Sequence, residues 1–229
     1  MVASATDFLG IGMYTPAEAA MYARITPQTM SRWVHGDKRF EAAIRAQVPE
    51  ADEKTITFLD FVQTLAVRAI REQKTVPLQK IRQAIDFCAE RGIQYPFARS
   101  HRTYWWDGSI HLDVEGYGLL QVSGKQRGQL AMKPIVEMYL AELTFNSDGL
   151  AREYMAYEAR QVKIVMRPEY RFGEPFVESC GHTAWTLWQA CLSEGSAKAA
   201  AGAYGVTEDE AFVAFKYIDS IRPPTNAAA

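Results

Sequence analysis

Apolar and polar positions near the start of the chain follow the spacing of two short amphipathic helices. Thr15-Pro16 precedes the first, with Glu18 three residues after the threonine, and Thr26-Pro27 precedes the second. A threonine hydroxyl caps free N–H groups, and proline at the first helical position lacks an N–H that would otherwise have no partner. Glu18 completes a capping box with Thr15. The pattern predicts two helices separated by a turn near Arg24-Ile25, the second of which Gly36 ends.

The predicted helix pair has an apolar side and a polar side. Its expected packing set is Ala19, Ala20, Ile25, Met30 and Trp33. The second helix then presents polar side chains outward, namely Gln28, Thr29, Ser31, Arg32 and His35. Two short helices joined by a tight turn are typical of a helix-turn-helix, and such side chains supply the donors and acceptors that bases and phosphates require. The alternative is a plain helical hairpin with a solvated polar face.

Two longer amphipathic helices are predicted next, after a segment at 36–54 that is either a wing or a loop. Thr57 caps the first, which runs from Phe58 to about Ile70 with a broad apolar face. Val76-Pro77 precedes the second, which ends before Gly92.

Charge is distributed unevenly along the chain. Twenty-five basic and 27 acidic side chains give a net charge of −2, which lacks the overall basic signature of many nucleic-acid binders. Eight basic and three acidic residues between Arg68 and Arg102 give that window +5, leaving −7 for the remainder. Its outward-facing Lys80, Arg82 and Arg91 are either a solvated face or a surface that contacts phosphate.

The middle of the chain changes to a β pattern. Aromatic and β-branched residues flank Asp107-Gly108, a dipeptide typical of a tight hairpin turn, and a strand is expected at 119–122. A helix is expected at 133–139, and a second hairpin around the turn at 146–149. Trp105 and Trp106 either line a ligand site or pack in the core or an interface.

The last part of the chain reads as one strand followed by three short helices. The strand covers 161–167, a turn follows at 171–175, and helices are expected at 184–194, 197–203 and 208–221. Thr207 caps the last helix, whose first residues are Glu208, Asp209 and Glu210. These acids suit a helix N-terminus but repel DNA phosphate, so the bundle is interpreted as an interaction or dimerisation module.

Composition and motifs set limits on the function. Apolar residues make up 48% and charged residues 23%, which is typical of a globular protein. The apolar stretches fall far short of the ~20 residues of a membrane helix, and the start lacks the pattern of a signal peptide, so a cytoplasmic protein is expected.

No cofactor, metal site or catalytic activity is expected either. Three cysteines and four scattered histidines form neither a CxxC nor an HExxH motif. Cys180-Gly181-His182 is the one close Cys/His pair, and its residues would have to meet in space to act as a nucleophile and base.

Three segments carry a resemblance to a known family. YTPAEAAMYARITPQTMSRWV resembles a MerR-like helix-turn-helix, and FLDFVQTLAVRAIREQKTVPLQKIRQAIDF resembles the helices that follow it. RPEYRFGEPFVESCGHTAW and GAYGVTEDEAFVAFKYI are similar to a small C-terminal helix-turn-helix-like domain. The combination resembles antitoxins of the VapB type, which accompany VapC PIN-domain ribonucleases. The C-terminal part departs from its family at 178–182, where Glu-Ser-Cys-Gly-His replaces a Gly-Thr-Arg-like turn.

The resemblance implies a sequence-specific DNA-binding antitoxin that represses its own operator and binds a PIN-domain ribonuclease toxin. A homodimer is expected as well, because it would place two helix-turn-helix units about one helical turn apart. The expected DNA contacts are Thr15, Thr26, Gln28, Thr29, Ser31, Arg32, His35, Lys38 and Arg39. Arg160, Arg167 and Arg171 are candidates for binding the toxin, chosen by position. The alternative function is a ligand-responsive MerR-like transcription regulator without a toxin partner, with the aromatic β segment as its sensor.

The expected fold class is α+β, mainly helical with a β-rich middle. The expected domains are 1–100 for the MerR-like helix-turn-helix, 101–160 for the β segment, 161–222 for the C-terminal bundle and 223–229 for a flexible tail.

Overall fold

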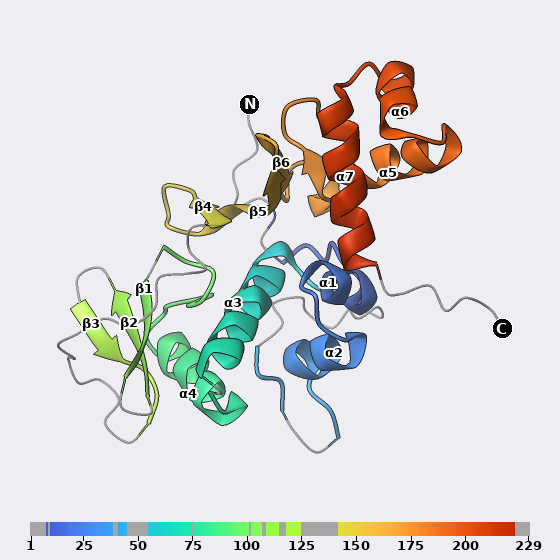
Figure 1. The fold of residues 1–229 in the computed structure, drawn as a ribbon. Helices are drawn as coiled ribbons and strands as arrows, with labels where there is room; N and C mark the ends of the chain where they lie inside the picture. Colours follow the sequence, from blue (N-terminus) through green and yellow to red (C-terminus); the bar gives the residue numbers. More distant parts are fainter. Residues whose placement is uncertain are drawn as a thin grey trace. The chain divides into compact units, whose positions relative to one another are not determined.

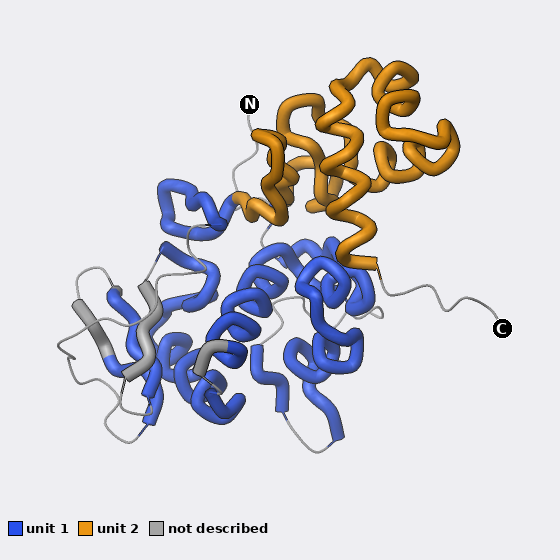
Figure 2. Tube along the Cα trace, in the orientation of Figure 1, with its two compact units in different colours: residues 1–152 blue, residues 153–229 orange. Residues whose placement is uncertain are grey.

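The chain forms two compact units, residues 1–152 and 153–229 (Figure 2). The computed structural model describes residues 8, 10–38, 41–44, 55–74, 76–100, 102–106, 109–114, 118–124 and 142–222. The structure is a mixture of helices and antiparallel sheets, so the expected α+β class is confirmed (Figure 1). The division into four segments remains a prediction.

Among the described residues of the first unit, helices dominate (Figure 1). They are α1 (Pro16–Tyr22), α2 (Pro27–His35), α3 (Phe58–Lys74) and α4 (Leu78–Ala89). The start of α3 is capped as predicted, because Thr57 Oγ1 accepts a hydrogen bond of 3.1 Å from the Asp60 N–H. The chain entering α1 and the chain entering α3 are joined by a bridge between Tyr14 and Ile56. The cap at Thr57 is a local signal, and the helices lie where the sequence pattern predicts them.

A three-stranded antiparallel sheet shares a core with these helices. Its strands are β1 (Arg102–Trp106), β2 (Ser109–Val114) and β3 (Gly118–Gln121), in the order β1-β2-β3. Trp106 pairs with Ser109, which confirms the hairpin predicted around 107–108. Ile110 and Leu112 of β2 lie in one hydrophobic cluster with residues of α2, α3 and α4. The side chains of Trp105 and Trp106 lie outside the described residues, as does the helix predicted at 133–139.

A second antiparallel sheet has the order β4-β5-β6-β7. Its strands are β4 (Leu143–Phe145), β5 (Ala151–Ala159), β6 (Val162–Met166) and β7 (Phe176–Val177). The strands β5 and β6 form a hairpin whose two-residue turn, Arg160-Gln161, has φ values of 50° and 62°. Positive φ at both central residues is the requirement of a type I′ turn, which asparagine and glycine usually meet.

Three short helices complete the second unit. They are α5 (Ala184–Ser193), α6 (Ala197–Tyr204) and α7 (Glu208–Ile221), close to the predicted ranges. Each begins at a hydroxyl cap, supplied by Thr183, Ser196 and Thr207. Alanines of all three helices pack in one small cluster, which lets the helices approach closely.

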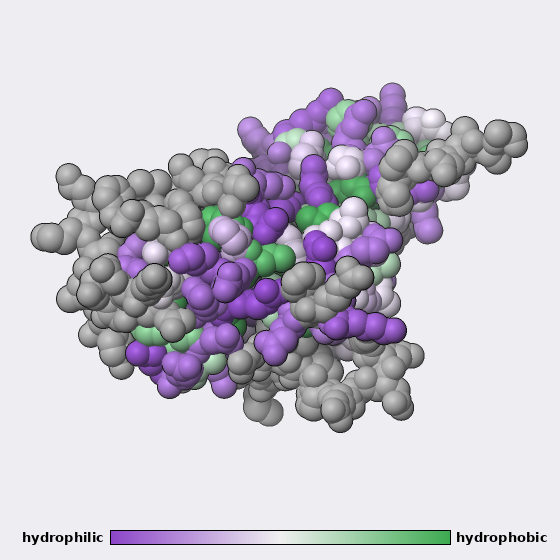
Figure 3. Space-filling model, turned by 90° about the horizontal axis from the view of Figure 1, so that it is seen from below, coloured by the Kyte–Doolittle hydropathy of each residue, from purple (hydrophilic) through white to green (hydrophobic). Residues whose placement is uncertain are grey.

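The surface agrees with the charged composition. In the view of Figure 3 the described residues are mostly hydrophilic, with small separate hydrophobic patches. Among the described residues, no helix is long and apolar enough to cross a membrane.

Candidate nucleic-acid interface

The α1–α2 pair is fixed by the caps that the sequence predicts. The Thr15 hydroxyl accepts from the Glu18 N–H at 3.2 Å, and Glu18 Oε2 accepts from the Thr15 N–H at 2.8 Å, which is a complete capping box. The Thr26 hydroxyl accepts from the Thr29 N–H at 3.2 Å and donates to the Thr29 hydroxyl at 2.9 Å. Both threonines, which were expected to contact DNA, therefore have a structural role at the helix starts.

The turn between the two helices is tight and held from outside. Arg24 adopts a φ of 53°, in the left-handed region, within the four residues that separate the two helices. Arg68 of α3 donates a hydrogen bond of 2.6 Å from Nη1 to the carbonyl of Ala23, the C-cap of α1. A carbonyl at a helix end has no partner within its helix, so Arg68 supplies the missing donor.

The predicted apolar side of the pair is buried as expected. Ala19, Ala20 and Met30 are fully buried and Trp33 is 5% exposed, while Ile25 packs against the core from a half-buried position. Small alanines in α1 let α2 approach closely. The polar side of α2 consequently faces away from the core.

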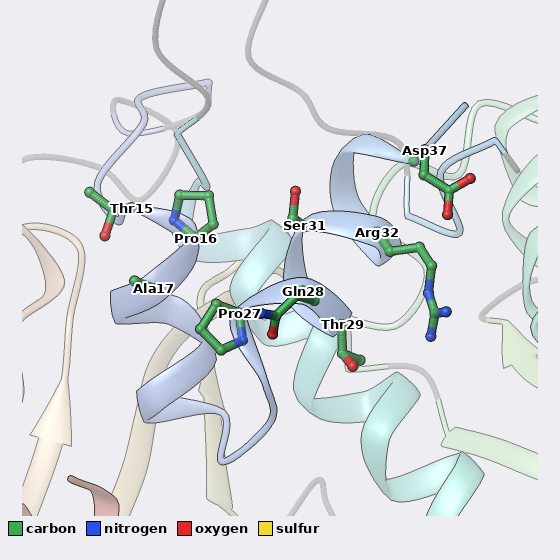
Figure 4. Close-up of a pocket in the computed structure, with 10 residues that line it drawn as sticks. Thr15, Pro16, Ala17, Pro27, Gln28, Thr29, Ser31, Arg32 and Asp37 are labelled. Carbon is green, nitrogen blue, oxygen red and sulfur yellow. The ribbon is translucent and has the colours of Figure 1, made fainter. Parts of the chain in front are cut away.

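A groove of about 750 Å³ lies along this polar side. It is lined by Thr15, Pro16, Ala17, Pro27, Gln28, Thr29, Ser31, Arg32, Gly36 and Asp37. Figure 4 shows Gln28, Thr29 and Arg32 on the outer side of α2, with Ala17 at the facing start of α1. Gln28 and Arg32 are exposed, and Thr29 and Ser31 are half-buried. The groove thus brings together five of the nine residues predicted to contact DNA.

The other predicted contacts lie at the end of α2 and beyond it. Thr26 caps α2, His35 is its half-buried last residue, and Lys38 is exposed in the loop after it. Arg39 lies outside the described residues. Asp37, which sequence reasoning did not select, brings a negative charge to one end of the groove.

The chain after α2 returns to the helix and is held there by α4. The N–H groups of Ala43 and Ile44 both donate to the Trp33 carbonyl at 2.8 Å. Arg82 of α4 donates to the carbonyls of Ala42 and Glu41, at 3.2 Å and 2.8 Å. The loop that follows α2 is therefore anchored on both sides.

The basic window between Arg68 and Arg102 serves mainly as a set of internal cross-links. Arg71 donates to the Val76 carbonyl, Arg91 to that of Phe87, and Arg99 to those of Gln94 and Asp148. With Arg68 and Arg82, five arginines of the window bond to main-chain oxygens. Of the outward-facing residues, Arg82 is half-buried against the loop after α2, whereas Arg91 is exposed, so a solvated face and a phosphate surface both remain predictions.

The three arginines predicted to bind a toxin lie in different surroundings. Arg160 forms an ion pair of 2.7 Å with Asp209 and stacks on the Phe212 ring. Arg167 is bonded to the carboxylates of Glu153 and Glu178. Burial opposes the charge of Arg167, but these two carboxylates outweigh burial and raise its pKa. Arg171 is exposed at a surface turn.

The cysteines are unsuited to act as nucleophiles. Burial raises the pKa of Cys88 to about 12, and burial likewise raises the pKa values of Cys180 and Cys191. The reactive species is the thiolate, which a raised pKa disfavours. In the part of the chain that the structure describes, no group of three or more His, Cys, Asp or Glu residues could hold a metal ion.

The chain resembles known proteins in sequence and in fold. No protein-family model matches the chain. The chain is 26% identical over 220 residues to a Mycobacterium tuberculosis protein named "Putative antitoxin VapB45", an alignment that covers 87% of this chain and 91% of that protein. The chain is thus similar to a protein named as an antitoxin.

A solved structure shares the fold. The crystal structure of Rv2018 from Mycobacterium tuberculosis superposes with a TM-score of 0.64 and 23% identity, covering 90% of this chain and 98% of that one. The likeness therefore extends over nearly the whole chain.

Proposed function

We propose that the chain is a DNA-binding antitoxin of the VapB type that represses its own operator and neutralises a PIN-domain ribonuclease. The observation that carries the DNA-binding part is the groove along α2. There, exposed hydrogen-bonding side chains gather on the side of the helix pair opposite to its buried apolar side. Similarity to a protein named as an antitoxin supports the toxin-binding part. The chain acts in the cytoplasm by binding alone, without a catalytic step of its own.

The outer side of α2 enters the major groove in this proposal. Arg32 has the geometry to donate two hydrogen bonds to the O6 and N7 atoms of guanine, and Gln28 to bond the N6 and N7 atoms of adenine. Thr29 and Ser31 add hydroxyl contacts, and Lys38 beyond the helix contacts phosphate.

The protein binds DNA as a homodimer. A dimer presents two α2 helices to two half-sites about one helical turn apart, which predicts an operator with two-fold symmetry.

Toxin binding is assigned to the second unit. Arg171 is exposed, whereas Arg160 and Arg167 are already paired with carboxylates of their own chain. Arg171 is therefore the most suitable of the three to contact carboxylates of the nuclease.

Fluorescence anisotropy tests the DNA-binding part. The probe is a labelled duplex from upstream of the chain's own gene, and the control is a scrambled duplex of the same composition, both measured over a salt series. Operator-selective binding with a steep loss of affinity as salt rises is the expected result. Equal, weak binding to both duplexes would contradict it.

The toxin-binding part needs its own test. The product of the neighbouring gene is co-expressed with the chain, purified as a complex and assayed for ribonuclease activity before and after the chain is removed. We expect co-purification and a nuclease that becomes active on removal. A neighbour that does not bind, or that is equally active in the complex, would refute this part and leave the DNA result standing.

A further inference from the structure

The groove along α2 has an apolar end at the starts of its two helices. Pro16, Ala17 and Pro27 line it there, and their side chains present only C–H surface. Ala17 and Pro27 are exposed, and Pro16 is half-buried. Figure 4 shows Pro27 beside Gln28 at the start of α2. The hydrogen-bonding side chains of the groove are therefore continuous with side chains that offer neither a donor nor an acceptor.

The backbone at the start of α2 also has few groups to offer a phosphate. Pro27, the first residue of the helix, has no N–H. The N–H groups of Thr29 and Met30 donate to the hydroxyl and the carbonyl of Thr26, at 3.2 Å and 3.0 Å. A helix start binds phosphate through such N–H groups when they have no partner. This end of the groove is therefore poorly suited to the DNA backbone.

The bases present one prominent apolar group in the major groove. Their edges carry N–H donors and nitrogen or oxygen acceptors, and thymine alone adds a methyl group, at C5. An apolar side chain next to polar base contacts therefore complements thymine. Pro27 has the position for this contact, because residues at the start of a recognition helix contact base edges, whereas the first helix crosses the DNA backbone.

We propose that Pro27 contacts the C5 methyl group of a thymine in each half-site of the operator. The inference rests on the proposed DNA binding and adds to it a base that is recognised without a hydrogen bond. Arg32 follows Pro27 by five residues, a rise of about 7.5 Å along α2. This rise equals about two base-pair steps of roughly 3.4 Å. The thymine is therefore expected about two base pairs from the guanine that Arg32 contacts.

Replacement of thymine by deoxyuridine tests the contact, because deoxyuridine lacks the C5 methyl group but keeps every hydrogen-bonding group of thymine. Fluorescence anisotropy of the full chain is measured with the labelled upstream duplex, in which the thymines are replaced one at a time. At one position in each half-site, the replacement is expected to weaken binding by about fourfold, the effect of burying one CH₂-sized group. Replacement at the other positions should change the affinity little.

Pro27→Ala identifies the residue that contacts the methyl group. Alanine removes most of the ring and is a good helix former. The variant should bind the thymine duplex more weakly than wild type, but deoxyuridine at the sensitive position should weaken its binding by less than about twofold. The coupling in this double-mutant cycle separates a direct contact from a general change in α2.

Pro77→Ala is the matched control. Pro77 is the exposed N-cap of α4, so the same substitution is made at another helix start of the same unit, outside the groove. This variant should keep the full effect of deoxyuridine. Circular dichroism melting shows that each variant is folded before its affinity is measured.

The possible failures can be told apart. Equal binding of wild type to the operator and to scrambled DNA would refute the proposed function, and this contact with it. Operator-selective binding that no deoxyuridine weakens would refute only the contact with thymine. If Pro27→Ala then weakened binding to both duplexes equally, Pro27 would be assigned to the deoxyribose of the backbone. An undiminished deoxyuridine effect in Pro27→Ala would assign the methyl contact to another residue and overturn the proposal.

Discussion

Arg68 Nη1 donates a hydrogen bond of 2.6 Å to the carbonyl of Ala23, forty-five residues earlier in the chain. The bond joins α3 to the end of α1 at the turn that sets the angle between α1 and α2. Ala23 is fully buried, so water competes only weakly for its carbonyl. The geometry of the polar groove therefore depends on a residue that does not line it.

Arg68→Met should destabilise the chain by about 1–3 kcal/mol, because it keeps the aliphatic stem but leaves the Ala23 carbonyl without its donor. Urea denaturation measures the change. Glu72→Gln is the control: Glu72 is paired with Arg68 at 3.6 Å, but its side chain is 66% exposed. An exposed pair of this kind contributes about 0.5 kcal/mol or less. Equal effects of the two substitutions would show that the Arg68–Ala23 bond contributes nothing.

Arg32→Ala should reduce operator affinity by roughly 1–3 kcal/mol while leaving binding to scrambled DNA little changed, as expected for loss of a guanine contact. Because Arg32 is exposed, the melting temperature should not move. Anisotropy with both duplexes gives the measurement. Lys198→Ala removes an exposed positive charge from α6 and should leave operator affinity unchanged. Parallel losses on both duplexes would mean that Arg32 contacts phosphate instead.

Glu210→Gln should reduce the change in the free energy of unfolding with pH in the acidic range. Burial opposes ionisation of Glu210, but bonds from Ser179 and from the N–H and hydroxyl of Thr207, together with nearby His182, lower its pKa below the usual 4.5. A carboxyl with a lowered folded-state pKa stabilises the fold above its unfolded-state pKa, and this contribution is lost as pH falls through the lowered value. Urea unfolding of wild type and variant should differ at pH 7 and converge in strong acid. A constant difference at every pH would contradict the linkage.

Phe172→Asn should stabilise the isolated protomer by about 1 kcal/mol, because Phe172 has a φ of 52° and asparagine adopts positive φ at a lower cost. Thermal unfolding at low protein concentration isolates this effect from any stabilisation by self-association. Phe172→Ala is the control, since it removes the same ring without relieving the backbone. A gain in Phe172→Ala equal to that in Phe172→Asn would attribute the effect to the exposed ring and not to φ.

Much of the fold follows from local signals in the sequence. Thr15, Thr26, Thr57 and Thr207 all cap helices at the predicted positions, because a cap depends only on residues within one turn. The same reasoning predicted the polar side of α2 that the groove now contains. The proposed contacts with DNA remain predictions.

The remaining features depend on neighbours that are distant in sequence. The window around Arg68 and Arg82 reads as a basic surface, but its guanidinium groups bond to carbonyls up to forty-five residues away. The turn at Arg160-Gln161 contains neither glycine nor asparagine, so nothing in its composition indicated positive φ. The positive φ of Phe172 likewise could not be predicted from the pattern of hydrophobic residues.

The cross-links from Arg68 and Arg82 end on main-chain oxygens of Ala23, Glu41 and Ala42, not on their side chains. Every residue type offers that oxygen, so these bonds themselves do not depend on the side chains at 23, 41 and 42. Related chains are then free to exchange Gln28, Thr29, Ser31 and Arg32 while keeping the same scaffold. In the proposed function, a few substitutions on this one exposed helix would change the operator that is read and leave the scaffold intact.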